Sequence, residues 1–235
     1  MSKDSLKNRR APIQAIKKPE SLRKEVYERI KNALVTNQFH PGQRLEEKYL
    51  SDFLQVSRTP IREALTRLER EGLVGSIANR GSFVKRFSVN DILEIMEMRE
   101  VAEGLAARLF TERADEEEKR HLRETMEPFT IDTVENDIDK YTQANVVFHR
   151  TIMRGAGNDR LVATLENLYD HYAVATHRRI IPLTKRERRS LQEHLRVIEA
   201  VEEGDSHKAE QEMRQHLRSI TDDFVRSSDE IPDLM

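Results

Sequence analysis

Apolar residues near the start of the chain recur with the period of a helix, which predicts two helices separated by a turn. The first helix begins at Ser21 and ends before the turn at residues 40–42, where His-Pro-Gly interrupts the pattern. The second covers about residues 46–54. The predicted buried faces consist of Leu22, Val26, Ile30, Ala33 and Leu34 in the first helix, and Leu45, Tyr49, Leu50 and Phe53 in the second.

A third helix follows after a tight connection, and the apolar period then changes to that of strands. Thr59 suits the N-cap of this helix and Pro60 its first position, where the missing N–H of proline costs nothing. Gly72 ends the helix. Residues 73–77 and 82–87 read as two short strands joined by a hairpin tip. This order of elements predicts a winged helix-turn-helix.

Everything after Ser88 has helical periodicity interrupted by proline and glycine. Short connections between such helices favour antiparallel packing, so we expect a mainly α protein whose C-terminal part is an antiparallel all-α bundle of about six helices. Thr184 and Glu187 have the spacing of a capping box. The predicted helices lie near residues 90–113, 115–127, 132–155, 158–181, 185–204 and 205–228.

Charge is distributed unevenly between the two predicted parts. Residues 1–88 hold 19 Lys or Arg and 10 Asp or Glu, whereas residues 89–235 hold 21 and 32, although the net charge of the whole chain is only −2. A basic first third is typical of a polyanion-binding protein, and a solvated basic face explains it equally well. The expected organisation is a basic arm at 1–20, a winged helix-turn-helix at 21–88, a helical domain at 89–228 and a tail at 229–235.

Composition narrows the function classes further. The chain has no cysteine, which excludes disulfides and thiolate metal sites. Its apolar runs are far shorter than the roughly 20 residues that a membrane helix needs. The N-terminal residues lack the apolar stretch of a signal peptide, so we expect a cytoplasmic protein.

Candidate DNA-reading residues gather at the predicted start of the third helix and in the wing. Arg58 and Arg62 lie one turn apart, and a guanidinium can make a bidentate contact with O6 and N7 of a guanine. Short hydroxyl side chains nearby suit phosphate contacts. Any one of these arginines alone is more typical of an ordinary surface; the ordered combination favours DNA binding. The full candidate set is Arg44, Ser57, Arg58, Thr59, Arg62, Arg80 and Gly81.

Residues 22–86 resemble the N-terminal domain of the GntR family of bacterial regulators. The resemblance is carried by Pro-Gly-Gln-Arg-Leu at 41–45, by Ser-Arg-Thr-Pro-Ile-Arg-Glu-Ala-Leu at 57–65, by the segment 68–73 and by the wing at 79–84. It implies that Arg44, Arg58, Thr59, Arg62, Arg80 and Gly81 contact double-stranded DNA. It also implies a homodimer bound to a short palindromic operator.

Three histidines occupy apolar faces of the predicted C-terminal helices, namely His149, His194 and His216. A buried imidazole needs a partner, because an unsatisfied buried polar group costs about 1–3 kcal/mol. Each histidine alone is more typical of a hydrogen-bonded core residue, whereas the three together are compatible with a shared metal ion. Asn145, one turn before His149, would present an oxygen from the same helix.

Residues 91–225 resemble the all-helical ligand-binding (FCD) domain of the FadR-like branch of the GntR family. The matching segments are Arg-Glu-x-x-Glu at 99–103, Asn-x-x-Phe-His at 145–149, Glu-His at 193–194 and the stretch from 204 to 216. The resemblance implies a divalent metal, zinc or nickel, held here by Asn145, His149, His194 and His216. The family's aspartate is replaced by Asn145, which lacks one negative charge and would bind the cation less tightly, bind it only with an anionic effector, or leave the site to a polar ligand alone.

Arg99 is the candidate for binding an effector carboxylate, because its guanidinium matches that anion. A salt bridge to Glu103, one turn on, is an equal alternative for the same side chain. His177, Arg178 and Arg179 either line the same cavity or cap a helix end, and solvent exposure is the simpler expectation for them.

The resulting hypothesis is a sequence-specific transcription regulator, a repressor rather than an enzyme, whose operator affinity is controlled by a small organic acid or sugar acid. Two alternatives from other classes are a metal-dependent enzyme in the helical domain and a non-specific nucleic-acid-binding protein. A sharp footprint on DNA would separate the regulator from both.

Overall fold

The computed structural model describes residues 19–176 and 186–229. The chain divides into two compact units: the first runs to Val84, except for Val35–Asn37, which belong with the second unit from Lys85 onward. The predicted arm at 1–20 lies almost entirely outside the described residues, as do His177, Arg178, Arg179 and Thr184 of the predicted cavity lining and capping box. Among the described residues, no helix is long and apolar enough to span a bilayer.

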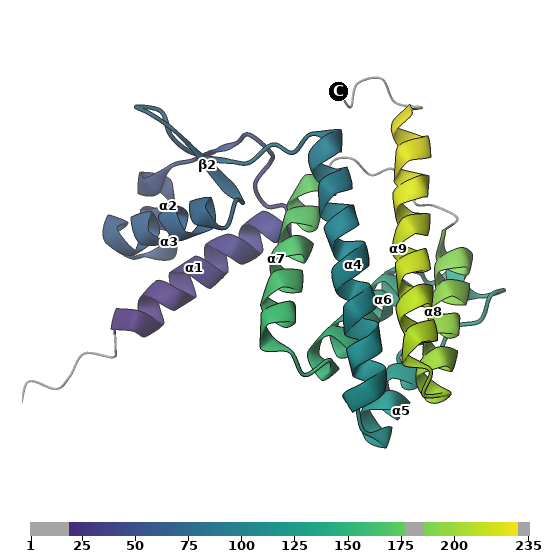
Figure 1. Ribbon diagram of the computed structural model, residues 1–235. Helices are drawn as coiled ribbons and strands as arrows, with labels where there is room; N and C mark the ends of the chain where they lie inside the picture. The colour runs from purple at the N-terminus through teal and green to yellow at the C-terminus, as the bar shows by residue number, and fades with distance from the viewer. Residues whose placement is uncertain (1–18, 177–185, 230–235) are drawn as a thin grey trace, which may run out of the picture. The chain divides into compact units, whose positions relative to one another are not determined.

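The first unit is a winged helix-turn-helix, as the sequence predicts (Figure 1). Its elements are α1 (Pro19–Val35), β1 (Arg44–Leu45), α2 (Glu47–Leu54), α3 (Arg58–Arg70), β2 (Val74–Ile77) and β3 (Gly81–Val84). The three strands form an antiparallel sheet in the order β1-β3-β2. The core is apolar and draws on every helix of the unit, with Val26, Ile30, Leu34, Leu50, Ile61, Leu65, Leu68, Leu73 and Val84 all buried.

The turn between α2 and α3 is fixed by its backbone. Gln55 takes the left-handed conformation with φ 56°, and the hydroxyl of Ser51 donates to the carbonyl of Val56 at 2.6 Å. The N-cap of α3 is Ser57 rather than the predicted Thr59, and it makes no side-chain capping bond. Pro60 therefore lies in the first turn instead of the first position, where its missing N–H is still free of cost because the first turn has no intrahelical acceptor for it.

The second unit is an all-helical bundle, which confirms the predicted fold class. It contains α4 (Val89–Arg113), α5 (Glu116–Glu124), a 3-10 turn η1 (Val134–Asn136), α6 (Ile138–Gly155), α7 (Asp159–Thr176), α8 (Glu187–Glu202) and α9 (Ser206–Asp229). The single helix expected over 132–155 is wrong: Asp137, with φ −143° and ψ 69°, separates η1 from α6 and accepts a hydrogen bond from the N–H of Lys140.

Helices α4 and α9 pack along each other and run antiparallel (Figure 1). Glu100 of α4 pairs with Arg218 of α9 at 2.7 Å, while Arg108, further along α4, pairs with Glu210, earlier in α9, at 3.3 Å. The absence of a side chain at Gly104 allows the close approach, since a Cβ there would lie 2.6 Å from Cγ of Arg214. Helices α6 and α8, which carry His149 and His194, pack against this pair, and α9 itself carries His216.

Candidate functional site

The start of α3 exposes the residues that the sequence predicts for DNA contact. Ser57, Arg58 and Thr59 are all exposed, and the side chain of Arg62 is 64% exposed one turn further on. Nε of Arg62 donates to Oε2 of Glu47 in α2 at 2.7 Å. The N-terminus of a helix adds free backbone N–H groups and a positive dipole end, so this end of α3 suits a phosphate backbone.

The wing brings Arg44 and Gly81 together. Arg44 in β1 is opposite Phe83 of β3, and Gly81, with φ 89°, begins β3. A Cβ at Gly81 would lie 3.9 Å from Nε of Arg44. Arg80 is exposed in the turn before it, so all seven predicted DNA contacts lie at the surface of the first unit.

The second unit contains a cavity of about 490 Å³ that receives side chains from α4, α6, α7, α8 and α9. Four of the predicted site residues line it: Arg99, Asn145, His149 and His216. Asn145 is half-buried, whereas the three others are almost fully enclosed. The walls also include Tyr141, Tyr169, Tyr172, Arg186 and Ser190.

The three histidines predicted from separate helix faces meet beside this cavity. Ligand atoms of His149, His194 and His216 lie within 4.8 Å of one another. The Nε2 atoms of His194 and His216 are 3.2 Å apart, and all three rings are buried. Two nitrogens bound to one tetrahedral zinc ion are about 3.4 Å apart, so only a small closure at His149 would complete a three-nitrogen site.

In two of these histidines, a glutamate carboxylate lies beside Nδ1. Nδ1 of His149 lies 2.8 Å from Oε2 of Glu103, and Nδ1 of His216 lies 2.8 Å from Oε2 of Glu193. An ionised carboxylate only accepts, so Nδ1 of His216, which is hydrogen-bonded to Glu193, carries the proton and its Nε2 keeps its lone pair. The contact of His149 with Glu103 lacks hydrogen-bond geometry and fixes no tautomer for His149. This is the arrangement in which outer carboxylates orient imidazoles toward a metal.

The third histidine is arranged differently. Because His216 Nε2 has no proton, the hydrogen bond of 3.2 Å between the two Nε2 atoms requires that His194 donate it. Nδ1 of His194 then accepts from the hydroxyl of Tyr141, 3.2 Å away. Metal binding at Nε2 of His194 would put the proton on Nδ1, so that Nδ1 donates to Tyr141 instead of accepting from it. A tyrosine hydroxyl can act as donor or as acceptor.

Each of the two buried carboxylates is in turn paired with an arginine that lines the cavity. Nε of Arg99 donates to Oε1 of Glu103 at 2.8 Å, and Arg186 contacts Oε2 of Glu193 at 3.0 Å. Arg186 is also bound to Ser219 and Asp223 of α9. Two chains of contacts therefore run from the cavity wall to the histidine cluster: Arg99–Glu103–His149 and Arg186–Glu193–His216.

Both alternatives considered for Arg99 are compatible with its position. The ion pair with Glu103 is present, and the guanidinium still faces the cavity, lying 4.7 Å and 4.6 Å from the ring centres of Tyr169 and Tyr172. Two aromatic faces and one carboxylate thus hold the cation in place. An anion entering the cavity meets a guanidinium that is already oriented.

Burial and neighbouring charges shift the pKa values in this region in opposite directions. Burial works to raise the pKa of Glu103, but Arg99 and His149 outweigh it and hold that pKa far below its usual value. Burial, assisted by the neighbouring imidazoles, lowers the pKa values of His194 and His216 well below 6.5. Burial raises the pKa of Tyr141 to about 12. The carboxylate is therefore charged and these two histidines are neutral at pH 7, which is the protonation state that a metal requires.

Sequence reasoning missed the roles of Glu193, Arg186 and Tyr141. Glu193 is buried, and its partners are His216 and Ser219 of α9, Arg186 just before α8, and Arg189 one turn earlier in α8. The periodicity of a single helix cannot reveal pairing across helices. The available signals were the Glu-His pair at 193–194 and the i, i+4 spacing of Arg189 and Glu193.

Comparisons with known proteins agree with both units. Residues 22–84 match the model described as "Bacterial regulatory proteins, gntR family", and residues 94–219 match the model of the FCD domain. The "Uncharacterized HTH-type transcriptional regulator YdhC" of Bacillus subtilis is 30% identical over 85% of this chain and 89% of its own length. The chain belongs to the GntR family of bacterial transcriptional regulators.

Other GntR-type regulators extend the comparison. The "HTH-type transcriptional repressor GlaR" of Escherichia coli is 28% identical over 81% of this chain and 90% of its own length. Among solved structures, Escherichia coli McbR/YncC shares the fold with a TM-score of 0.72 at 20% identity, over 88% of this chain and 98% of that one. A GntR regulator from Rhodococcus sp. RHA1 does so with a TM-score of 0.67 at 22% identity, over 88% and 98%. The protein is thus a DNA-binding transcriptional regulator of the GntR family with an FCD domain.

Proposed function

We propose that this regulator is a repressor whose homodimer binds a palindromic operator and releases it when a small carboxylate-type metabolite binds in the helical unit. Two relatives, GlaR and RspR of Escherichia coli, are named as repressors, which supports the direction of regulation. The observation that carries the proposal is that Arg99, His149 and His216 line one cavity, with His194 buried directly beside the two histidines. By thermodynamic linkage, an effector that weakens DNA binding must itself bind more tightly to the DNA-free protein.

For operator recognition, Arg58 and Arg62 are proposed to read guanines, with Ser57, Thr59, Arg44, Arg80 and Gly81 on phosphates and the groove. Arg58→Ala and Arg62→Ala should abolish the gel shift of operator DNA at protein concentrations that just saturate it with wild type, while the oligomeric state by light scattering stays unchanged. Specific binding retained by both variants would refute the assignment.

For the metal, His149, His194 and His216 are proposed to hold a divalent ion, zinc or nickel, with the amide oxygen of Asn145 as a weak fourth ligand. The ion would supply a positive charge for the effector carboxylate. Because Asn145 brings no charge of its own, the anion would complete the site and raise metal affinity. His149→Ala and His194→Ala should lose metal measured by elemental analysis, and Asn145→Asp should bind it more tightly without effector. Wild-type protein that takes up no zinc or nickel by calorimetry, even with excess organic acid, would refute the metal.

For the effector, Arg99 is proposed to bind the carboxylate. Thermal-shift screening of organic acids and sugar acids should find a compound that stabilises the protein and reduces its affinity for operator DNA. Arg99→Lys keeps the charge but loses the planar fork, so we expect weaker stabilisation by that compound. Equal stabilisation of the variant would exclude Arg99 as the anchor.

For the dimer, an apolar strip on α4 is the proposed contact. Met98 and Val101 are 55% and 51% exposed, which is unusual for large apolar side chains on neighbouring turns. Val101→Lys should shift the mass in solution toward that of a monomer, while Glu166→Lys, at an exposed position of another helix, α7, makes a charge change outside this strip and should leave the mass unchanged. A Val101→Lys protein that keeps the wild-type mass in solution would show that this strip is not the dimer interface.

A further inference from the structure

Arg62, the proposed base-reading arginine of α3, is tied to α2 by a hydrogen-bonded ion pair. Its Nε donates to Oε2 of Glu47 at 2.7 Å, although the two side chains are 64% and 36% exposed. Most exposed ion pairs contribute little to stability. Stability therefore does not explain why Glu47 places a carboxylate beside the surface proposed to bind DNA.

The backbone holds the two partners in place. Glu47 is the first residue of α2, and Arg62 lies one turn into α3. The intervening turn is set by the left-handed Gln55 and by the bond from Ser51 to Val56. Glu47 is thus a fixed anchor against which the long side chain of Arg62 is oriented.

The atom that Glu47 engages leaves the useful end of the guanidinium available. Nε points back along the side chain, whereas the two terminal Nη groups form the fork that can bind O6 and N7 of guanine. Arg58, by contrast, has no ion pair or hydrogen bond to any side chain in the described part of the chain. The start of α3 therefore presents one oriented and one unrestrained arginine.

We propose that Glu47 is a positioning residue for DNA recognition: it holds Arg62 by Nε so that the terminal fork reads a guanine, and its carboxylate opposes phosphates wherever that guanine is absent. The inference rests on the proposed contact of Arg62 with DNA. A pre-oriented side chain loses less conformational freedom on binding, which benefits the correct site. A carboxylate at this surface repels phosphates and so disfavours all sites at which the guanine contact does not compensate, and the same residue therefore favours the correct site and opposes the others.

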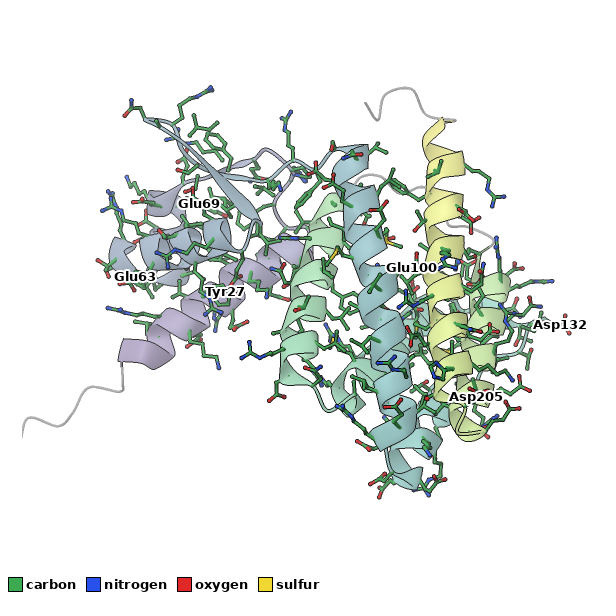
Figure 2. The ribbon with its side chains drawn as sticks, in the orientation of Figure 1. Tyr27, Glu63, Glu69, Glu100, Asp132 and Asp205 are labelled. Atoms are coloured by element: carbon green, nitrogen blue, oxygen red, sulfur yellow. The ribbon has the colours of Figure 1, made fainter. Side chains whose placement is uncertain are left out.

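The test uses the full-length protein and a pool of random duplexes. Operator sequences are selected with wild-type protein, and affinities for the best sequence, for its single-base variants and for unrelated DNA are then measured at several salt concentrations. The variants are Glu47→Ala, Glu47→Gln, Arg62→Ala and the double variant. Glu69→Ala is the matched control: Glu69 is exposed on α3, the helix that carries Arg62, and its substitution removes one negative charge, as Glu47→Ala does (Figure 2).

We expect Arg62→Ala to identify its base by a loss of discrimination of roughly 5- to 150-fold at one position of each half-site. Glu47→Ala should reduce discrimination at that same position by roughly 3- to 10-fold and should bind unrelated DNA more tightly. Glu47→Gln keeps an oxygen that accepts from Nε, so it should retain most of the base discrimination of wild type. Because it lacks the negative charge, it should still bind unrelated DNA more tightly than wild type does. Glu69→Ala should leave the base preference unchanged.

The outcomes separate the inference from the function on which it rests. If Arg62→Ala leaves base preference intact, the proposed DNA contact of Arg62 is wrong and the role of Glu47 falls with it. If Arg62→Ala loses discrimination at one base position but Glu47→Ala discriminates there as well as wild type does, the contact of Arg62 stands and the inference about Glu47 is overturned. A uniform loss of affinity at every position, accompanied by altered circular dichroism, would show that Glu47 only stabilises α2 and would also overturn it.

Discussion

The pair of Arg99 and Glu103 is the charged contact of the bundle whose removal should be most costly. Both side chains are about 5% exposed or less, and the carboxylate also faces His149. Glu103→Gln keeps the shape but leaves a buried guanidinium without its counter-charge. Breaking one partner of a buried pair costs about 3–5 kcal/mol, which is a large share of the roughly 5–15 kcal/mol that stabilises a typical domain.

The effect is measured by urea and thermal unfolding followed by circular dichroism, with a chelator present so that metal binding does not contribute. A loss of this size corresponds to a drop in unfolding temperature of roughly 6–20 °C for a protein of this length. Glu100→Gln is the control on the same helix: its partner Arg218 is 55% exposed, and we expect a change below about 1 kcal/mol.

A double replacement completes the argument. Arg99→Met combined with Glu103→Leu removes both charges and should recover most of the lost stability, because well-packed apolar residues commonly replace a buried pair without loss. The reasoning would be refuted by a Glu103→Gln protein within about 1 kcal/mol of wild type, or by a double variant less stable than either single one.

Three further outcomes follow from packing, protonation and metal binding. Gly155→Ala should destabilise by about 1–3 kcal/mol in urea, because its Cβ would lie 2.5 Å from the buried ring of Phe110, whereas Gly75→Ala meets nothing within 4 Å and should be neutral. Burial keeps the pKa values of His194 and His216 below 6.5, so below that pH the unfolded chain binds protons that the metal-free folded protein does not. The unfolding free energy should therefore fall on acidification by up to about 1.4 kcal/mol per pH unit for each histidine; a flat profile from pH 7 to 5 would contradict the assignment. Zinc at a hundred times its dissociation constant should stabilise by about 2.7 kcal/mol, reversibly on chelation, and an unchanged melting temperature would count against the site.

Much of the fold follows from local patterns. Helical spacing of apolar residues, together with breakers such as Gly72, placed most helix ends within a few residues. The exceptions have physical reasons. Strand β1 has two residues and exists only because β3 pairs with it, and the kink at Asp137 depends on a local capping bond that interrupts an otherwise helical pattern.

The candidate site could be predicted only in part. Three histidines on inward faces suggested a cluster, and the structure brings them together. Their orientation comes from Glu103 and Glu193, whose pairing spans different helices and leaves no periodic trace in the sequence. The same holds for Glu47, which is an ordinary acidic residue until the fold brings α2 beside α3.

The two arginine–glutamate–histidine chains also restrict how this regulator could be re-targeted. Adapting the cavity to a cationic or neutral metabolite would begin with loss of Arg99 or Arg186. Loss of Arg99 removes the arginine partner of Glu103, and loss of Arg186 leaves Glu193 with Arg189 and Ser219, so each loss weakens what orients a carboxylate toward its imidazole. The sign of the charge in the cavity is therefore tied to the stability of the bundle itself, and a cavity for a different compound is reached more easily by reshaping the tyrosine-lined walls than by reversing that sign.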